Sequence, residues 1–202
     1  HCKNLINLDL TWCYQINDIS FVQHCKGLIS LNFSDCHRIE DLSFLQDCKY
    51  LTRLNLSRSE NLKDLSFLQH CNELTSLKIS RSIQIINTSF LQHCNKLTRL
   101  SLSRCTNLYD LSFLKHCKKL IRLNLSGCSQ IDDISFLQHC TGLTRLNLSK
   151  CDQIKDLSFV QHCNELTSLD LTWLKINDFS FIQHCKELTN LNLSKCREIN
   201  DL

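Results

Sequence analysis

Residues 120–142 have the sequence LIRLNLSGCSQIDDISFLQHCTG, and close copies of this stretch recur along the whole 202-residue chain. A Ser-Phe-Leu, Ser-Phe-Val or Ser-Phe-Ile tripeptide marks each copy, with phenylalanines 23 residues apart except for the last pair, which are 22 apart. They are Phe21, Phe44, Phe67, Phe90, Phe113, Phe136, Phe159 and Phe181. A fixed period of about 20 to 50 residues indicates a solenoid, in which each unit packs on its neighbours. Most repeated residues therefore have structural roles, and functional residues are expected where the copies differ.

The first part of each copy, residues 120–128 in this example, has the pattern L-x-x-L-x-L-x-x-C. Leu123 and Leu125 alternate with polar residues, which predicts a short strand with its leucines facing inward and Arg122, Asn124 and Ser126 facing outward. Stacked copies of this strand would pair in parallel, about 4.8 Å apart, in one concave sheet. We expect the outward asparagines to form hydrogen-bonded ladders along that sheet.

The second part of each copy returns the chain on the convex side. Asp133 or Ser135 is well placed to cap a short helix or 3₁₀ segment over residues 135–140. The apolar residues of this part complete the core: Ile131, Ile134, Phe136, Leu137 and Cys140. The aspartate recurs in every copy except one, which has Asn87. We interpret it as a row of caps and not as a set of catalytic carboxylates.

The repeats begin at Leu5, Leu28, Leu51, Leu74, Leu97, Leu120, Leu143, Leu166 and Leu188. This register predicts a single array over residues 1–202, with eight coils and part of a ninth. The chain starts at His1 and stops inside a repeat without a polar capping sequence. Open solenoid ends expose strand edges, so we expect the native protein to continue at both ends.

The composition excludes several classes of protein. Apolar residues make up 43% of the chain, enough for a continuous core, while the absence of proline and the presence of only three glycines exclude a linker. No apolar run approaches the roughly 18 residues of a membrane span, and no stretch has the pattern of a signal peptide. The net charge of +3 is too small to identify a partner.

The fifteen cysteines occupy two fixed positions of the repeat. Nine precede the next strand: Cys2, Cys25, Cys48, Cys71, Cys94, Cys117, Cys140, Cys163 and Cys185. Six follow the strand, at Cys13, Cys36, Cys105, Cys128, Cys151 and Cys196, and serine replaces cysteine there at Ser59 and Ser82. Small buried thiols tolerate such exchange, whereas disulfide partners do not. The pattern predicts free thiols and a reducing compartment, the cytoplasm or the nucleus.

The pattern L-x-x-L-x-L-x-x-C resembles that of leucine-rich repeats. The two cysteines resemble those of the repeats in F-box substrate receptors of ubiquitin ligases. The Ile-x-Asp-Leu-Ser-Phe-Leu stretch is similar to the short repeats of bacterial internalins and of the phosphatase-1 regulatory repeat protein. The resemblance implies an α/β solenoid of horseshoe shape, with a parallel concave sheet and short helical or 3₁₀ convex segments. It also implies a function in binding proteins, without catalysis by the repeat itself.

Neither a metal site nor an active site is predicted. The recurring His-Cys dipeptide, as in His24-Cys25, places adjacent side chains in different directions, whereas zinc needs about four converging ligands. Asp47 also replaces the histidine in one copy. The serine, histidine and aspartate rows lack the unique constellation that a catalytic triad requires. His37 is the only histidine outside the row, and we interpret it as a solvated turn residue. No cofactor is expected.

Candidate binding residues lie at the third, fifth, seventh and eighth positions of the strand signature. Over nine strands these positions have seven arginines and three lysines against three aspartates, a net charge of +7. The basic residues selected are Arg53, Arg58, Lys78, Arg81, Arg99, Arg104, Arg122, Arg145 and Lys150. The word Asp-Leu-Thr-Trp flanks them on both sides, with Asp9 and Trp12 before them and Asp170 and Trp173 after them. Tryptophan and arginine are frequent interface anchors.

These residues favour a protein-interaction scaffold that binds an acidic protein or peptide on a basic concave face. Two alternatives stay open. The same arginines could bind nucleic acid or a phosphorylated ligand, although interleaved aromatic residues for base stacking are missing. The repeats could also form the substrate-recognition arm of an F-box-type ubiquitin ligase. No membrane partner is expected.

Overall fold

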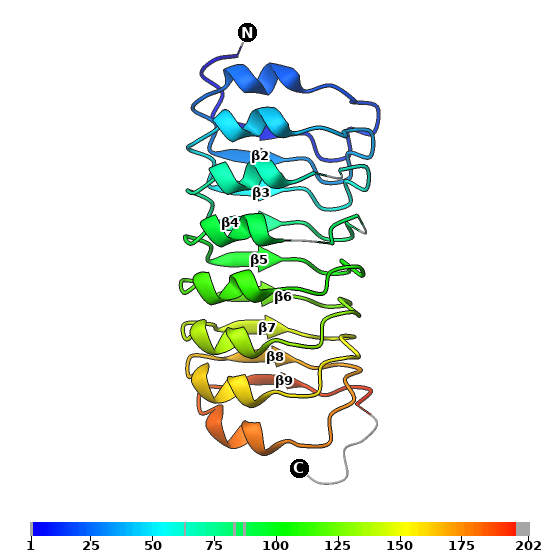
Figure 1. Ribbon diagram of the computed structural model, residues 1–202, viewed down its shortest axis with the longest axis vertical. Coiled ribbons are helices and arrows are strands. Elements are labelled where there is room, and N and C mark those ends of the chain that lie inside the picture. Colours follow the sequence, from blue (N-terminus) through cyan, green and yellow to red (C-terminus); the bar gives the residue numbers. More distant parts are fainter. Residues whose placement is uncertain (1, 63, 83, 87, 197–202) are drawn as a thin grey trace.

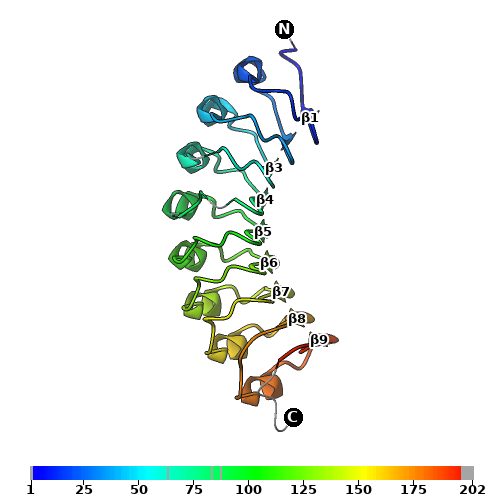
Figure 2. The ribbon, with the colours of Figure 1, turned by 90° about the vertical axis from the view of Figure 1, so that its right-hand side faces the viewer.

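The computed structural model describes residues 2–62, 64–82, 84–86 and 88–196. In this part of the chain, nine short strands form one parallel sheet in sequence order, and eight 3₁₀-helices alternate with them (Figure 1). The strands line a concave face and the 3₁₀-helices a convex face (Figure 2). The expectation of an α/β solenoid with a parallel concave sheet is therefore confirmed.

The strands are β1 (Asn7–Asp9), β2 (Ser30–Asn32), β3 (Arg53–Asn55), β4 (Ser76–Lys78), β5 (Arg99–Ser101), β6 (Arg122–Asn124), β7 (Arg145–Asn147), β8 (Ser168–Asp170) and β9 (Asn190–Asn192). The 3₁₀-helices are η1 (Ser20–His24), η2 (Ser43–Asp47), η3 (Ser66–His70), η4 (Ser89–His93), η5 (Ser112–His116), η6 (Ser135–His139), η7 (Ser158–His162) and η8 (Ser180–His184). Among the residues that the structure describes, no helix has the length and apolar character needed to cross a membrane.

Each strand pairs with the next in a constant register. Leu100 lies beside Leu123, and Leu123 lies beside Leu146, so each strand residue neighbours its own copy 23 positions away, or 22 positions away between β8 and β9. Leu123 is 2% exposed between an exposed Arg122 and a half-buried Asn124, as the alternation predicts. Burial of one leucine side chain contributes about 1.5–3 kcal/mol, and the stack repeats this contribution in every coil.

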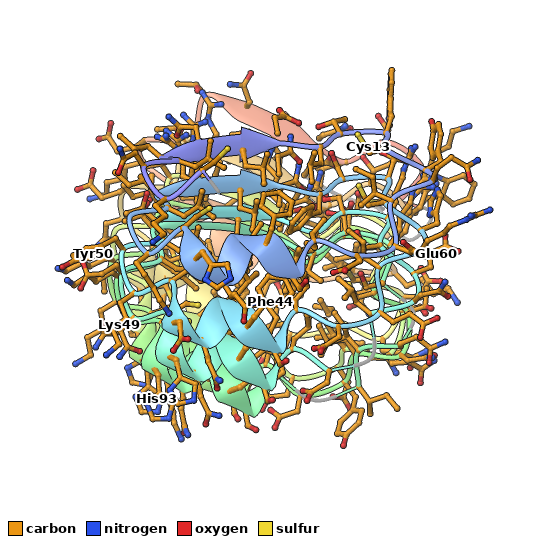
Figure 3. The ribbon with its side chains drawn as sticks, turned by 90° about the horizontal axis from the view of Figure 1, so that it is seen from above. Cys13, Phe44, Lys49, Tyr50, Glu60 and His93 are labelled. Carbon is orange, nitrogen blue, oxygen red and sulfur yellow. The ribbon has the colours of Figure 1, made fainter. Side chains whose placement is uncertain are left out.

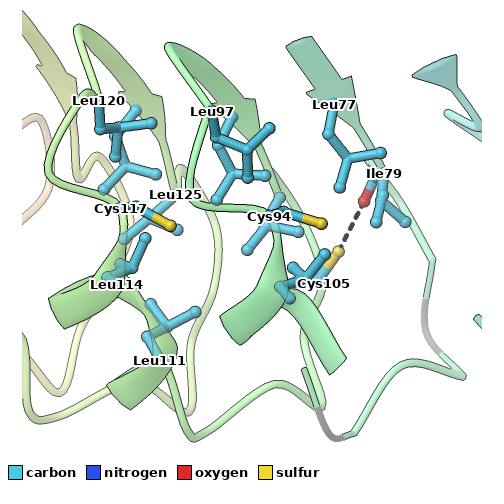
Figure 4. Packing of buried hydrophobic residues seen from close by; sticks show 14 of the residues in the cluster. Leu77, Ile79, Cys94, Leu97, Cys105, Leu111, Leu114, Cys117, Leu120 and Leu125 are labelled. Atoms are coloured by element: carbon cyan, nitrogen blue, oxygen red, sulfur yellow. Dashed lines mark hydrogen bonds between the residues drawn. The ribbon is translucent and has the colours of Figure 1, made fainter. Parts of the chain in front are cut away.

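The core is a column of leucine, isoleucine and cysteine side chains between the two faces. Figure 4 shows part of this core, with Leu97 and Leu120 near the strands and Leu111 and Leu114 beside the convex segments. Viewed along the stack, Phe44 and His93 lie on the 3₁₀-helix side, while Tyr50 and Glu60 lie on opposite flanks (Figure 3). The molecule therefore has four sides: a concave face, a convex face and two flanks of turns.

The recurring aspartate, one of the two expected caps, accepts a hydrogen bond at the start of every described 3₁₀-helix except η4. Asp133 Oδ1 accepts a hydrogen bond from the backbone N–H of Ser135 at 2.8 Å. Six further copies make the same contact: Asp18, Asp41, Asp64, Asp110, Asp156 and Asp178. These hydrogen bonds lower the pKa of Asp18, Asp64 and Asp178, because they stabilise the carboxylate. The exception Asn87 lies outside the described residues.

Five of the cysteines that follow a strand donate a hydrogen bond to a carbonyl oxygen of the preceding coil. Cys105 Sγ lies 2.9 Å from the carbonyl oxygen of Ile79 (Figure 4), and Cys128, Cys151 and Cys36 make equivalent contacts at 3.0–3.1 Å. Ser59 Oγ replaces the thiol with a 3.0 Å hydrogen bond to Phe33. Because a hydroxyl makes the same contact, the exchange of cysteine for serine at this position has a direct structural reason.

All fifteen cysteines are free. Those before the strands form a second column of thiols, in which Cys94 Sγ lies 3.4 Å from the carbonyl oxygen of Leu68. Burial raises the pKa of the Cys71, Cys94 and Cys117 thiols to about 12, because desolvation disfavours the thiolate. The thiols therefore stay protonated at neutral pH and act as donors.

The eighth signature position, which follows each strand by three residues, has a left-handed backbone. Its φ is between 59° and 73° in all nine coils, although only Gly127 is a glycine. The other residues are Trp12, Asp35, Arg58, Arg81, Arg104, Lys150, Trp173 and Lys195. This conformation is uncommon for residues with a side chain and is a strained outlier for bulky ones. Sequence periodicity gave no indication of it.

We predict that Cys105→Ala destabilises the protein more than Cys105→Ser does. Alanine removes the donor to the Ile79 carbonyl and lowers the free energy of unfolding by about 1–2 kcal/mol. Serine keeps the donor, as Ser59 does. Cys105→Ser is therefore expected to lower the free energy of unfolding by less than half of that amount. Urea unfolding with an unchanged m-value measures both. Equal losses in the two variants would contradict a hydrogen-bonding role for the thiol.

A second pair of variants tests the left-handed position. Gly127→Ala should lower the free energy of unfolding by about 1 kcal/mol, because its φ of 73° is unfavourable for alanine. Arg104→Gly should change it by less than about 0.5 kcal/mol, since relief of strain and greater entropy of the unfolded chain offset each other. Urea unfolding provides the measurement. A loss above about 1 kcal/mol in Arg104→Gly would show that the side chain itself stabilises the fold.

Candidate partner-binding face

Three arginines lie side by side on the concave face. Arg99, Arg122 and Arg145 occupy the same position of β5, β6 and β7, and the strand register pairs each one directly with the next. All three side chains are exposed. Like charges directly opposite one another on adjacent strands are destabilising. The register thus produces a row of positive charge, which we call the arginine row.

The arginine row has no anionic partner within the chain. Across the ranges that the structure describes, none of its guanidinium groups forms an ion pair or a hydrogen bond with a protein group. Other basic residues behave differently, because Lys26 pairs with Asp47 at 2.8 Å and Lys96 with Glu73 at 2.6 Å. The donors of the arginine row are therefore available to a ligand.

A shallow hollow of about 590 Å³ extends along the sheet around this row. Six of the residues selected from the sequence line it: Arg53, Lys78, Arg99, Arg122, Arg145 and Asp170. Its floor is made by the strands themselves, with Leu77 at one end and Leu146 near the other. The structure therefore brings together about half of the selected residues in one open depression.

The asparagines of the concave face form the expected cross-strand hydrogen bonds in part: Asn32 Nδ2 donates to Asp9 Oδ2 at 3.1 Å, and Asn147 Nδ2 donates to Asp170 Oδ2 at 3.3 Å. Asn124 Oδ1 accepts a hydrogen bond from the backbone N–H of Ser126 at 3.0 Å, so the side chain closes a local turn. Asn32, Asn55, Asn147 and Asn192 make the same contact two residues ahead. The side-chain oxygens are used locally because an acceptor two residues from its donor needs little further ordering, and no hydrogen bond joins two of these asparagines within the described residues.

Asp9 and Asp170 use the same local contact. Asp9 Oδ1 accepts from the backbone N–H of Thr11 at 2.9 Å, and Asp170 Oδ1 accepts from that of Thr172 at 3.0 Å. The hydrogen bonds with Thr11 lower the pKa of Asp9. Both carboxylates therefore have a structural role, and Asp170 additionally lines the hollow.

The remaining selected residues form a separate row along one flank. Trp12, Arg58, Arg81, Arg104, Lys150 and Trp173 occupy the left-handed turns after the strands and do not line the hollow. Trp12 is 63% exposed and Trp173 is 39% exposed. The selected residues thus belong to two parallel rows, one on the strands and one on the rim.

The rim has contacts that the sequence analysis did not assign. Asp35 accepts hydrogen bonds from Trp12 Nε1 and from Arg58 Nη1, both at 3.1 Å. At the other end, the Lys195 ammonium lies 5.7 Å from the Trp173 ring centroid, within range of a cation–π interaction. Asp35 occupies the same repeat position as Trp12 and Arg58, one coil away from each, and this spacing was the available signal.

His37 differs from its interpretation as a solvated residue. Its ring is half-buried and stacks on Tyr14, with centroids 5.9 Å apart and an interplanar angle of 8°. Together with Trp12, this pair gives the rim an aromatic group at its N-terminal end. Within the described ranges, no group of three or more histidine, cysteine, aspartate or glutamate side chains is arranged to hold a metal ion.

Comparisons with known proteins agree with this geometry. A family model described as leucine-rich repeats (2 copies) matches residues 95–139. An internalin (inlF) from Listeria monocytogenes is 27% identical, with a TM-score of 0.84, and the alignment covers 96% of this chain and 55% of that one. Internalin C2 (inlC2) from Listeria monocytogenes is 23% identical, with a TM-score of 0.82 and coverages of 95% and 82%.

The functional domain of InlJ from Listeria monocytogenes, which includes a cysteine ladder, is 22% identical, with a TM-score of 0.70. The alignment covers 99% of this chain and 46% of the InlJ domain chain. No curated protein sequence matches the chain. The chain spans just over half the length of the inlF internalin structure. The strand signature, the stacked coils and these similarities lead to one conclusion: the chain has the leucine-rich-repeat fold, built from cysteine-containing repeats of 22 or 23 residues.

Proposed function

We propose that this chain is a protein-binding scaffold that holds an acidic protein or peptide on its concave face. The observation that carries the proposal is the arginine row, which combines three arginines paired in register on adjacent strands with the absence of internal partners in the described residues. Guanidinium groups bind carboxylates through two parallel hydrogen bonds, and charge-assisted bonds of this kind are about twice as strong as neutral ones. An acidic partner would relieve the repulsion within the row.

The surroundings of the row support a macromolecular ligand. The hollow is open and spans strands from β3 to β8, whereas small-molecule sites are usually enclosed. The rim adds Trp12 and Trp173, residue types that are enriched among interface hot spots. Repeat folds generally use their extended concave surface for binding.

A nucleic-acid ligand is the second candidate, because phosphates also bind to arginine rows. The concave face offers little for base stacking, since the strand positions that point outward from β1 to β9 have no aromatic residue. Protein binding is therefore favoured over single-stranded nucleic acid.

We predict that the combined change Arg99→Glu, Arg122→Glu and Arg145→Glu leaves the fold intact and abolishes partner capture. The three side chains are exposed, so their replacement removes no core contact. The natural partner would be identified by pull-down and mass spectrometry, and circular dichroism would verify folding. The combined change Lys115→Glu, Lys118→Glu and Lys119→Glu is the matched control, because these exposed residues lie in η5 and the turn between η5 and β6 and the total charge change is the same. Unchanged capture by the triple variant would move the site to another face.

Salt dependence distinguishes the two candidate ligands. A single-stranded RNA oligomer is expected to show no binding at about 50 mM salt, where phosphate contacts are strongest. An acidic polypeptide such as poly-L-glutamate should bind under the same conditions and lose binding in the triple variant. Fluorescence anisotropy measures both. Tight RNA binding that weakens steeply towards about 200 mM salt would favour the nucleic-acid function instead.

A further inference from the structure

We infer that the acidic element bound on the concave face is an α-helix that lies along the stack and crosses the strands. This inference rests on the proposed function and specifies the shape of the partner. It follows from the spacing of the arginine row, from the charges at the two ends of the hollow and from the length of the hollow.

The spacing of the arginines is set by the sheet. Arg99, Arg122 and Arg145 are register partners on consecutive strands, and neighbouring strands lie about 4.8 Å apart. The first and third arginine Cα atoms are therefore separated by about 9.6 Å. A ligand that pairs with all three must present three carboxylates at this interval along a straight line.

An α-helix meets this requirement. Side chains on one face of a helix recur once per turn, at about 5.4 Å, so carboxylates two turns apart are separated by about 10.8 Å. The difference from the arginine row is about 1 Å over two steps, which side-chain rotations absorb. Carboxylates at positions i, i+4 and i+7 of the partner would face Arg145, Arg122 and Arg99 in turn.

Other backbone conformations fit less well. In an extended strand, side chains on the same face recur every second residue and lie about 6.7 Å apart. The third carboxylate of such a strand would therefore lie about 4 Å beyond the third arginine. A polyproline helix presents one face every third residue, at about 9.3 Å, and would reach only every second arginine. A strand would therefore need much larger side-chain displacements than a helix to reach all three arginines, and a polyproline helix would leave the middle arginine unpaired.

The next two coils continue the pattern. Beyond Arg99, β4 has Ser76 at the row position and Lys78 two residues later, and β3 has Arg53 at the row position. A helical partner would place residue i+11 near Lys78 and residue i+14 near Arg53. The hollow that holds all these residues spans five strand steps, about 24 Å, which equals about 16 residues of helix.

The charges at the ends of the hollow give the helix a direction. Lys78 and Arg53 lie towards one end, and Asp170 lies at the other. A helix has a partial positive charge at its N-terminus and a partial negative charge at its C-terminus. Its N-terminus would therefore lie over β8, near Asp170, and its C-terminus over β3.

Three synthetic peptides of about 18 residues, with identical numbers of glutamates, test the inference. The first is a helix former with glutamates at i, i+4, i+7, i+11 and i+14. The second has the same residues scattered around the helix. The third alternates glutamates with neutral residues and includes prolines that prevent a helix. We expect the first to bind about tenfold more tightly than the others, to gain helical circular dichroism on binding and to lose affinity in Arg122→Glu but not in Lys119→Glu.

The outcomes distinguish the inference from the proposed function. If the proline peptide binds as tightly as the striped helix, the helical partner is wrong while the acidic-partner proposal stands. If the scattered helix binds equally, the spacing argument is wrong. If none of the peptides binds at low salt, the acidic-partner proposal itself fails.

Cross-linking tests the direction of the bound helix separately. A benzophenone at the N-terminus of the striped peptide should cross-link to the coil of β8, and one at the C-terminus to the coil of β3. The reverse placement would overturn the assigned direction.

Discussion

The hydrogen-bond register between neighbouring strands is the constraint on which the rest of the structure depends. It places every residue beside its copy in the next coil, so each residue type forms a column. Columns of leucine fill the core, and columns of polar residues satisfy one another across coils. Thr98 Oγ1, for example, donates to the carbonyl oxygen of Thr75, one period away. In the described part of the chain, no buried side-chain nitrogen or oxygen lacks a hydrogen-bond partner.

The same register has an unfavourable consequence at the outward positions. A charged residue that recurs in consecutive coils faces its own charge, as Arg99, Arg122 and Arg145 do. On the strands, Ser76 and Ser168 end this arrangement on either side of the three arginines. The rim shows a related cost, since large side chains occupy left-handed turns in which Gly127 would be the least strained choice. A residue whose position costs free energy, through charge repulsion or a strained backbone, is a candidate for a functional role. The arginine row and the row along the rim both contain such residues.

Sequence reasoning predicted the parts of the fold that depend on period and polarity. The alternation around Leu123 gave the strand, and the recurring aspartate gave one of the two caps considered for the 3₁₀-helices, as at η6. It also selected the residues that line the hollow. It did not predict the left-handed turns, the local contacts of Asn124 or the bridge from Asp35 to its two neighbours. These features depend on backbone torsions and on competition between contacts two and 23 residues away, and a single sequence contains no direct measure of either.

Arginine-specific footprinting of the complex with the natural partner tests the central claim most directly. Phenylglyoxal modifies exposed arginines, and mass spectrometry quantifies the modification at each position with and without the partner. The account predicts strong protection of Arg99, Arg122 and Arg145, with little change at Arg38, which lies in an exposed turn away from the strands. Unchanged modification of these three arginines in a saturated complex would contradict the assignment of the concave face as the binding surface.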